Sequence, residues 1–278
     1  VTRSLVRFSL GFIWFKYCIN YLYRRSMLKD FLSTRAKKKQ SQIVVVASFP
    51  KSGSTFLTRK LAALPSCELK PLVPIGERRE QELDEGVVRQ VLCKSRGGHV
   101  IAHHHVRLNA STADLAVRYS IRFVVLVRDL MDCLVSLDDH LNNESKLWPI
   151  GFWSDRLYND LNESSLSRIH AVTITSAPWF INFYLSWVLW NEEYPEIQPP
   201  IFLTYSQLFQ NPESTITSLV SNFGINASQA DIRKSLEEKT YSRFNKGISG
   251  RGRDLFLKDS AAASVVDQLI QCYPNVDF

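Results

Sequence analysis

The sequence predicts an α/β protein, a single domain in which a central, mainly parallel sheet is flanked by helices. A continuous apolar run at 43–46 and a mostly apolar segment at 121–127 are typical of strands that are buried on both faces of a parallel sheet. Each run is followed by a polar turn and then by apolar residues at helical spacing, and this order is the repeating unit of α/β folds. The chain has 278 residues, 45% of them hydrophobic, which is enough for such a core.

The first strand leads into a phosphate-binding pattern. After 43–46 come Pro50, Lys51 and a Ser/Gly turn, and a helix is expected from Thr55 to Leu64. The backbone N–H groups of such a turn converge at the helix N-terminus, where the helix dipole and a lysine favour an anion. A chance turn in an ordinary strand-turn-helix unit is the alternative. Lys51 precedes Gly53, whereas the GxxxxGK[ST] loop of ATPases and GTPases places its lysine after the last glycine.

The next two elements bring three adjacent histidines. A helix is expected from Gln81 to Lys94 and a strand at 99–106, HVIAHHHV. Since side chains alternate along a strand, His103 and His105 share one side and His104 points to the other. A general base is the favoured role, because imidazole titrates near neutrality. Histidines that only complete hydrogen bonds at a strand end are the alternative, and no third ligand at a recognisable spacing supports a metal site.

The second apolar strand, 121–127, ends at a candidate phosphate ligand. Arg128 follows it directly, and a helix is expected from Asp129 to Leu137. Ligands of open α/β sheets bind at the carboxyl ends of the strands, and a guanidinium suits a terminal phosphate. The alternative is a strand-end arginine that pairs with Asp129 or Asp132.

Four motifs in order, over about residues 43–259, resemble the sulfotransferase family. They are PKSGSTFL; Arg128 with Ser136 eight residues later; a strand at 201–205 followed by SQLFQNPESTITSLVSNFGI; and FNKGISGRG at 244–252. The resemblance implies a P-loop-NTPase-like fold. It also implies transfer of a sulfuryl group from 3′-phosphoadenosine 5′-phosphosulfate (PAPS), which leaves as adenosine 3′,5′-bisphosphate (PAP). The expected acceptor is a hydroxyl or amine of a small molecule, lipid or glycan, and no metal is needed.

The resemblance also implies roles for single residues. His105 would be the base and His103 would stand where the family has a lysine, while a shift of one residue would select His104. Lys51 would stabilise the charge that develops on the transferring group. The residues expected to bind the nucleotide are Lys51, Ser52, Gly53, Ser54, Thr55, Phe56, Arg128, Ser136, Tyr205, Lys246 and Gly247. Helix packing is the alternative role for Phe56.

The sequence departs from the family pattern near the last motif. Asn245 stands where the family usually has arginine, and Arg243, Arg251 or Arg253 is a candidate to supply the charge. A flexible basic loop before a C-terminal helix, 261–271, is the alternative. Residues 138–178 are expected to form a variable lid or acceptor region, followed by an aromatic-rich helix at 179–193.

The net charge of +7 comes from an N-terminal extension, residues 1–40. These carry ten Lys/Arg and one acid, whereas 41–278, the expected sulfotransferase domain, carries 24 basic and 26 acidic residues. No nucleic-acid partner is therefore expected. The extension is too interrupted by charges for a membrane-spanning helix. Helices docked on the domain with a basic linker at 35–39 are favoured, ahead of peripheral contact with anionic lipid and of a cleaved signal peptide.

The cysteines predict a cytoplasmic protein, membrane-associated if the extension binds lipid. They are five in number, widely spaced and without a CxxC pair, which favours neither a disulfide framework nor a zinc site. Two other functions stay open. A P-loop kinase would need magnesium and an acid near a strand end, such as Asp129. A non-catalytic nucleotide-binding module is favoured by Asn245 and by the missing lysine before the histidine.

Overall fold

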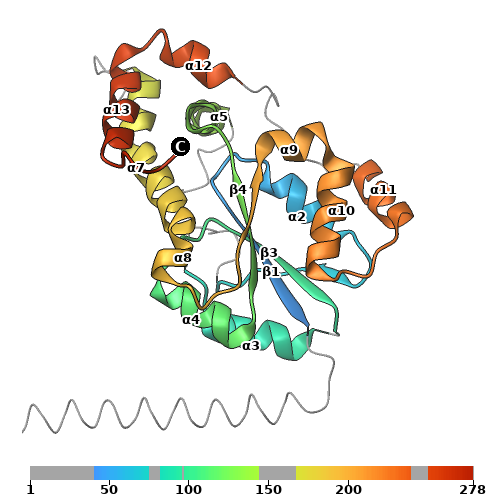
Figure 1. Ribbon diagram of the computed structural model, residues 1–278. Coiled ribbons are helices and arrows are strands. Elements are labelled where there is room, and N and C mark those ends of the chain that lie inside the picture. The colour runs from blue at the N-terminus through green and yellow to red at the C-terminus, as the bar shows by residue number, and fades with distance from the viewer. Residues whose placement is uncertain (1–40, 75–81, 96, 144–166, 239–249, 278) are drawn as a thin grey trace, which may run out of the picture. The chain divides into compact units, whose positions relative to one another are not determined.

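A computed structural model describes residues 41–74, 82–95, 97–143, 167–238 and 250–277. They form five strands and surrounding helices (Figure 1). The strands are β1 (Gln42–Ser48), β2 (Cys67–Leu69), β3 (His99–His104), β4 (Arg122–Val127) and β5 (Ile201–Thr204). They form one sheet in the order β2-β3-β1-β4-β5, and each of these pairs is parallel. The predicted α/β class with a central parallel sheet is confirmed.

The first strand lies in the middle of the sheet. In β1, Val46 is level with His103 of β3, and Ser48 is level with Leu126 of β4. Because all strands run the same way, their carboxyl ends meet at one edge. The loops after β1, β3 and β4 therefore leave the sheet side by side.

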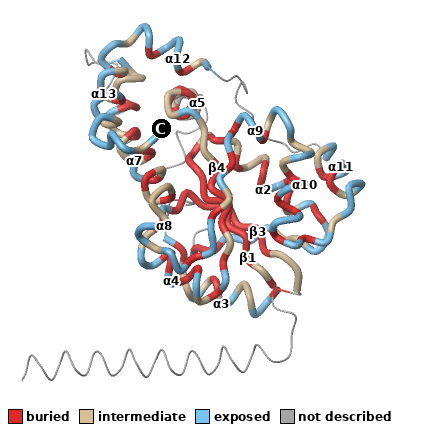
Figure 2. Tube along the Cα trace, in the orientation of Figure 1, coloured by how far each residue is buried: buried red, intermediate tan, exposed pale blue. Residues whose placement is uncertain are grey.

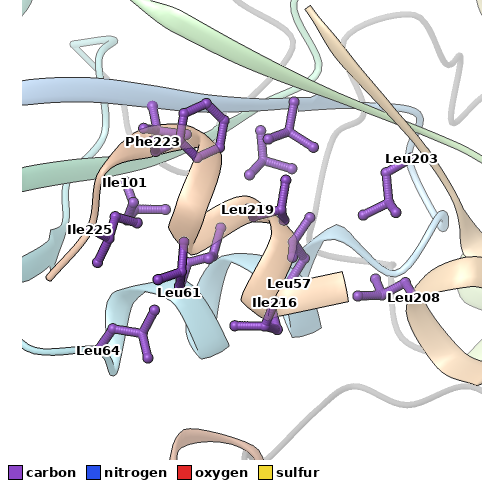
Figure 3. Close-up of a cluster of buried hydrophobic side chains, with 14 of the residues drawn as sticks. Leu57, Leu61, Leu64, Ile101, Leu203, Leu208, Ile216, Leu219, Phe223 and Ile225 are labelled. Atoms are coloured by element: carbon purple, nitrogen blue, oxygen red, sulfur yellow. The ribbon is translucent and has the colours of Figure 1, made fainter. Parts of the chain in front are cut away.

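One face of the sheet is covered by α2 (Ser54–Ala62) and α10 (Pro212–Phe223), with α9 (Tyr205–Gln210) and α11 (Gln229–Glu237) beside them. Figure 3 shows the core between them, where Leu57 and Leu61 of α2 meet Ile216 and Leu219 of α10. Alternate residues of the strands, including Val44 and Val46 of β1, complete this cluster. Burial of these side chains holds α2, and with it the turn before α2, against the sheet.

The other side of the sheet carries α3 (Glu85–Lys94), α4 (Ala110–Tyr119), α7 (Arg168–Val188) and the short α8 (Trp190–Glu193) (Figure 1). Trp187 of α7 is fully buried, with its ring centroid 4.7 Å from that of Phe123 in β4. Its indole N–H donates to the carbonyl of Val106 at 3.1 Å. These contacts fix α7 to the sheet just beyond β3.

A third group of helices, α5 (Leu130–Asn143), α12 (Arg251–Phe256) and α13 (Ser260–Gln271), packs together with α7. Two ion pairs of 2.8 Å join α5 to its neighbours, Arg168 with Asp138 and Arg251 with Asp139. Figure 2 shows the buried residues concentrated in the sheet, with exposed residues on the outer helices.

The aromatic-rich helix was predicted at 179–193, but it begins at Arg168 and continues through Pro178 to Val188. Proline lacks an N–H and usually ends a helix, which is why the sequence suggested a break there. Burial of Phe180, Phe183 and Trp187 outweighs this cost. The predicted variable region 138–178 is therefore partly helical, since α5 also extends to Asn143. Residues 144–166 lie outside the described residues.

Several short elements were not predicted, namely β2, α4, α9, α11 and α12. The predicted helix at 81–94 begins at Glu85, where the Asp84 side chain accepts from the N–H of Val87. The predicted strand at 201–205 ends one residue earlier, and Tyr205 opens α9. The extension 1–40 lies outside the described residues, so its structure, the domain boundary at 40 and its membrane contact stay predictions. Among the described helices, none combines the length and apolar character that a membrane span requires.

Candidate active site

The turn between β1 and α2 has the backbone of an anion-binding loop. Lys51 has φ 71° and Gly53 has φ 88°, and both lie in the left-handed region. A Cβ at Gly53 would lie only 2.7 Å from Cε2 of Phe209, so the turn has room for glycine alone. The Ser52 hydroxyl donates to the carbonyl of Phe49 at 2.8 Å and so closes the turn. Since α2 begins at Ser54, its first N–H groups have no acceptor within the helix.

Arg128 lies directly against this turn. Its Nη1 donates to the carbonyl of Lys51 at 3.2 Å, which joins the end of β4 to the predicted phosphate loop. Its Nη2 lies 3.3 Å from Oδ2 of Asp132, and its guanidinium lies 4.1 Å from the ring centroid of Tyr205. The ion pair that the sequence offered as an alternative is therefore present, together with the contact to the loop. Ser136 is buried one helical turn beyond Asp132, so both lie on one side of α5, while Arg128 precedes the helix by two residues.

Three aromatic rings continue from Arg128 across the turn. The Tyr205 ring lies 4.3 Å from Phe209, and Phe209 lies 5.0 Å from Phe56, centroid to centroid. Lys60 follows, with Nζ 5.3 Å from the Phe56 centroid. Burial raises the pKa of Tyr205, although the positive charge of Arg128 opposes this shift. The tyrosine hydroxyl thus stays protonated at neutral pH.

His103 and His105 share a side at the end of β3, as predicted. The Nδ1–H of His105 donates to the carbonyl of Ser48 at 2.8 Å. A carbonyl oxygen can only accept, so in the neutral ring this bond puts the lone pair on Nε2. Nε2 of His103 lies 3.3 Å from Oγ of Ser48, and the two rings are 5.0 Å apart in an edge-on arrangement. Ser48 ends β1, three residues before Lys51, so the histidines lie beside the start of the loop.

His104 has a different environment. It is fully buried, and its Nε2 accepts the backbone N–H of Leu72 at 3.0 Å. This nitrogen is therefore occupied in supporting the chain after β2. His103 and His105, in contrast, both contact Ser48 at the end of β1.

The last motif is only partly described. Lys246 and Gly247, predicted at the nucleotide, lie outside the described residues, as do Arg243 and Asn245. Arg251, a predicted source of charge, pairs with Asp139, and Arg253 is exposed on α12. Asp129 accepts the N–H of Asp132 at 2.8 Å at the start of α5.

Cys133, next to Asp132, is fully buried, and burial raises the pKa of its thiol to about 12. Cys67, Cys93, Cys133 and Cys272 are free thiols. Within the described part of the chain, no group of three or more His, Cys, Asp or Glu side chains is placed to hold a metal ion.

Sequence reasoning did not identify Ser48, Lys60 and Phe209 as part of this neighbourhood. Phe209 lies four residues after Tyr205, and this spacing places both on one side of a helix; it was missed because the helix α9 was not predicted. Ser48 and Lys60 carry no local signal, because their contacts are with distant segments: the histidines for Ser48, and the carbonyls of Leu236 and Glu238 for Lys60.

Comparisons with known proteins identify the family and the fold. The family model described as "Sulfotransferase domain" matches residues 41–247. No curated protein matches the sequence significantly. The fold is similar to that of mouse sulfotransferase SULT7A1, whose crystal structure is complexed with PAP. Identity is 17%, the TM-score is 0.55, and the match covers 85% of this chain and 86% of that one.

Two further solved structures have lower TM-scores. Retinol dehydratase in complex with androsterone and inactive cofactor PAP has 14% identity and a TM-score of 0.45, over 85% of this chain and 82% of that one. A sulfotransferase from Alicyclobacillus acidocaldarius has 14% identity and a TM-score of 0.44, over 83% and 96%. Since the family model spans most of the 278 residues and the fold agrees, the chain belongs to the sulfotransferase family.

Proposed function

We propose that the protein transfers a sulfuryl group from PAPS to a hydroxyl or amine of its acceptor, with His105 as the base. The observation that carries this proposal is the hydrogen bond from His105 Nδ1–H to the Ser48 carbonyl. It leaves Nε2 as the basic nitrogen and holds the ring at the entrance of the phosphate loop. The PAP that is bound to mouse SULT7A1, the structure with the highest TM-score among those described, supports PAPS as the donor.

The reaction follows from these groups. His105 Nε2 takes the proton of the acceptor as its oxygen or nitrogen attacks sulfur. The new bond to sulfur forms as the bond from sulfur to the bridging phosphate oxygen breaks, and PAP leaves with that electron pair. Lys51 and the N–H groups of the turn stabilise the negative charge on the leaving phosphate, as preorganised donors do in many enzymes.

The other phosphate of the donor is assigned to Arg128 and Ser136, with Lys246 and Gly247 as further ligands. The proposed surface for the adenine ring comprises Tyr205 and Phe56, whose aromatic rings can stack on it. Acceptor class stays broad: a small molecule, a lipid or a glycan. The cysteine pattern supports a cytoplasmic location, and residues 1–40 are the proposed membrane contact.

The kinase alternative has less support. It requires a carboxylate at a strand end to hold magnesium, and Asp129 was the candidate. One of its oxygens accepts the N–H of Asp132, as a helix-capping residue does.

A thermal-shift measurement tests the donor. A ligand that binds only the native state raises the unfolding temperature, so PAP is expected to stabilise the protein more than ATP with magnesium does. A larger shift with magnesium and ATP would support the kinase instead.

The general base is tested by His105→Asn, because the Asn amide Nδ2 takes the place of imidazole Nδ1 and can donate to the Ser48 carbonyl but cannot take a proton near neutral pH. Transfer from sulfur-labelled PAPS to a panel of phenols, alcohols and amines should fall by about 10²- to 10⁴-fold, with PAP affinity retained. His99→Gln is the matched control, because His99 Nε2 donates to the Phe223 carbonyl at 3.0 Å at the far end of β3. Equal losses in both variants would contradict the assignment. No transfer by the unaltered protein would favour a non-catalytic binding module.

A further inference from the structure

The carboxylate of Asp132 gathers three donors from two distant parts of the chain. The residue lies in the first turn of α5 and is buried. Its Oδ2 faces Arg128 Nη2 at 3.3 Å and accepts the N–H of Gly250 at 2.9 Å. Its Oδ1 accepts the N–H of Gly252 at 2.7 Å. One carboxylate thus joins the arginine at the end of β4 to the segment that enters α12.

The segment from Gly250 to Gly252 lies in direct contact with α5. A Cβ at Gly252 would lie 2.4 Å from both the Asp132 nitrogen and the Met131 carbonyl carbon, so the two backbones touch. A second anchor, the 2.8 Å pair of Arg251 with Asp139, lies two turns further along α5. Asp132 and Asp139 therefore both hold α12, and Asp132 also contacts Arg128.

Arg128 has a defined orientation because its contacts lie on different sides. The Lys51 carbonyl holds Nη1, Asp132 holds Nη2, and the Tyr205 ring covers one face of the guanidinium. A guanidinium binds phosphate through a planar fork, so its orientation decides how many hydrogen bonds it can offer. Of these contacts, the one with Asp132 is the charged one.

We propose that Asp132 is a positioning residue for recognition of the donor's terminal 3′-phosphate: it orients Arg128 and keeps Gly250–Gly252 beside it. The inference rests on the proposed function. A carboxylate near an arginine can also act oppositely, by repelling an incoming phosphate. The two backbone N–H groups argue against repulsion as the main effect, since they compensate the carboxylate charge from the side of α12.

Asp132→Asn tests this inference. The amide has the same shape, but its NH₂ group cannot accept a hydrogen bond, so at least one of the three contacts is lost. Binding of PAP and of adenosine 5′-phosphate, which lacks the 3′-phosphate, would be measured by calorimetry on the full chain. We expect the Kd for PAP to rise about tenfold, or ~1.4 kcal/mol, and that for adenosine 5′-phosphate to change less than about twofold. In turnover, KM for PAPS should rise with kcat nearly unchanged.

The matched control is Asp139→Asn, which removes the other anchor of α12. It should leave the ratio of the two nucleotide affinities unchanged. An Asp132→Asn protein that loses affinity equally for both nucleotides would show a merely structural role, and one that binds PAP more tightly would show repulsion; either result overturns the inference. If the unaltered protein binds PAP no better than adenosine 5′-phosphate, the proposed donor itself is wrong.

Discussion

Gly53→Ala should damage the phosphate loop for two separable reasons. Gly53 has φ 88°, and an L-residue in the left-handed region costs about 1–2 kcal/mol. Its new Cβ would lie 2.7 Å from Phe209 Cε2 and 3.3 Å from Tyr205 Cδ2. Overpacking of this kind costs about 1–3 kcal/mol. The expected loss in the free energy of unfolding is therefore about 2–5 kcal/mol, a large part of the ~5–15 kcal/mol typical of a protein.

The Phe209 ring cannot easily swing away from the new methyl group. It is packed between Tyr205 at 4.3 Å and Phe56 at 5.0 Å, so its movement would disturb both rings. We therefore expect PAP affinity to fall together with stability. Urea unfolding followed by tryptophan fluorescence measures the stability, and calorimetry measures the affinity.

Gly224→Ala is the matched control for the backbone cost. Gly224 has φ 63°, and no atom lies within 4 Å of its would-be Cβ, so this variant carries the strain without the clash. Phe209→Leu removes the clashing atoms, and in combination with Gly53→Ala it should recover at least ~1 kcal/mol relative to additivity. If Gly53→Ala costs no more than Gly224→Ala, the argument from Phe209 is refuted.

Two further predictions concern buried polar groups. Lys60 Nζ donates to the carbonyls of Leu236 and Glu238, at the C-terminal end of α11, at 3.2 and 2.7 Å. Lys60→Met should therefore lower the free energy of unfolding by about 1–3 kcal/mol and speed hydrogen exchange in α11. Unchanged exchange would contradict a role of Lys60 in holding the end of this helix. Burial raises the pKa of the Cys133 thiol from 9.0 to about 12. The buried neutral thiol therefore contributes fully to the free energy of unfolding below pH 9. As the pH rises from 9 towards 12, this contribution falls by ~1.4 kcal/mol per pH unit. Between about pH 8 and 10.5, the stability difference between the unaltered protein and Cys133→Ala should shrink by ~2 kcal/mol, and parallel pH curves would disprove the shift.

Much of the sheet could be predicted because its signal is local. The apolar runs of β1 and β4 are long enough to identify buried strands, and the polar turns after them mark the ligand edge. The alternation of a strand also predicted which side His103 and His105 share. In contrast, β2 has three residues and no residue that is fully buried, so nothing in its sequence distinguishes it from a loop.

The remaining features depend on contacts between distant segments. Pro178 suggested a helix end, yet packing of α7 against α5 and α13 carries the helix through it. The sequence named Asp132 only as an ion partner of Arg128, because its bonds to Gly250 and Gly252 connect residues far apart in the chain. Local patterns identify such side chains, but only the folded chain shows what they join.

The central place of β1 has a consequence for how the protein folds. Gln42 pairs with His99 of β3 and Val44 pairs with Arg122 of β4. Among the described strands β1 is synthesised first, so it cannot pair until β3 and β4 have been synthesised. Such long-range pairing gives a high contact order and slow folding. Until then, the β-branched run 43–46 is exposed and prone to associate with other chains. We therefore expect the yield of refolded protein to fall as the chain concentration rises, while the molecules that do fold keep their activity.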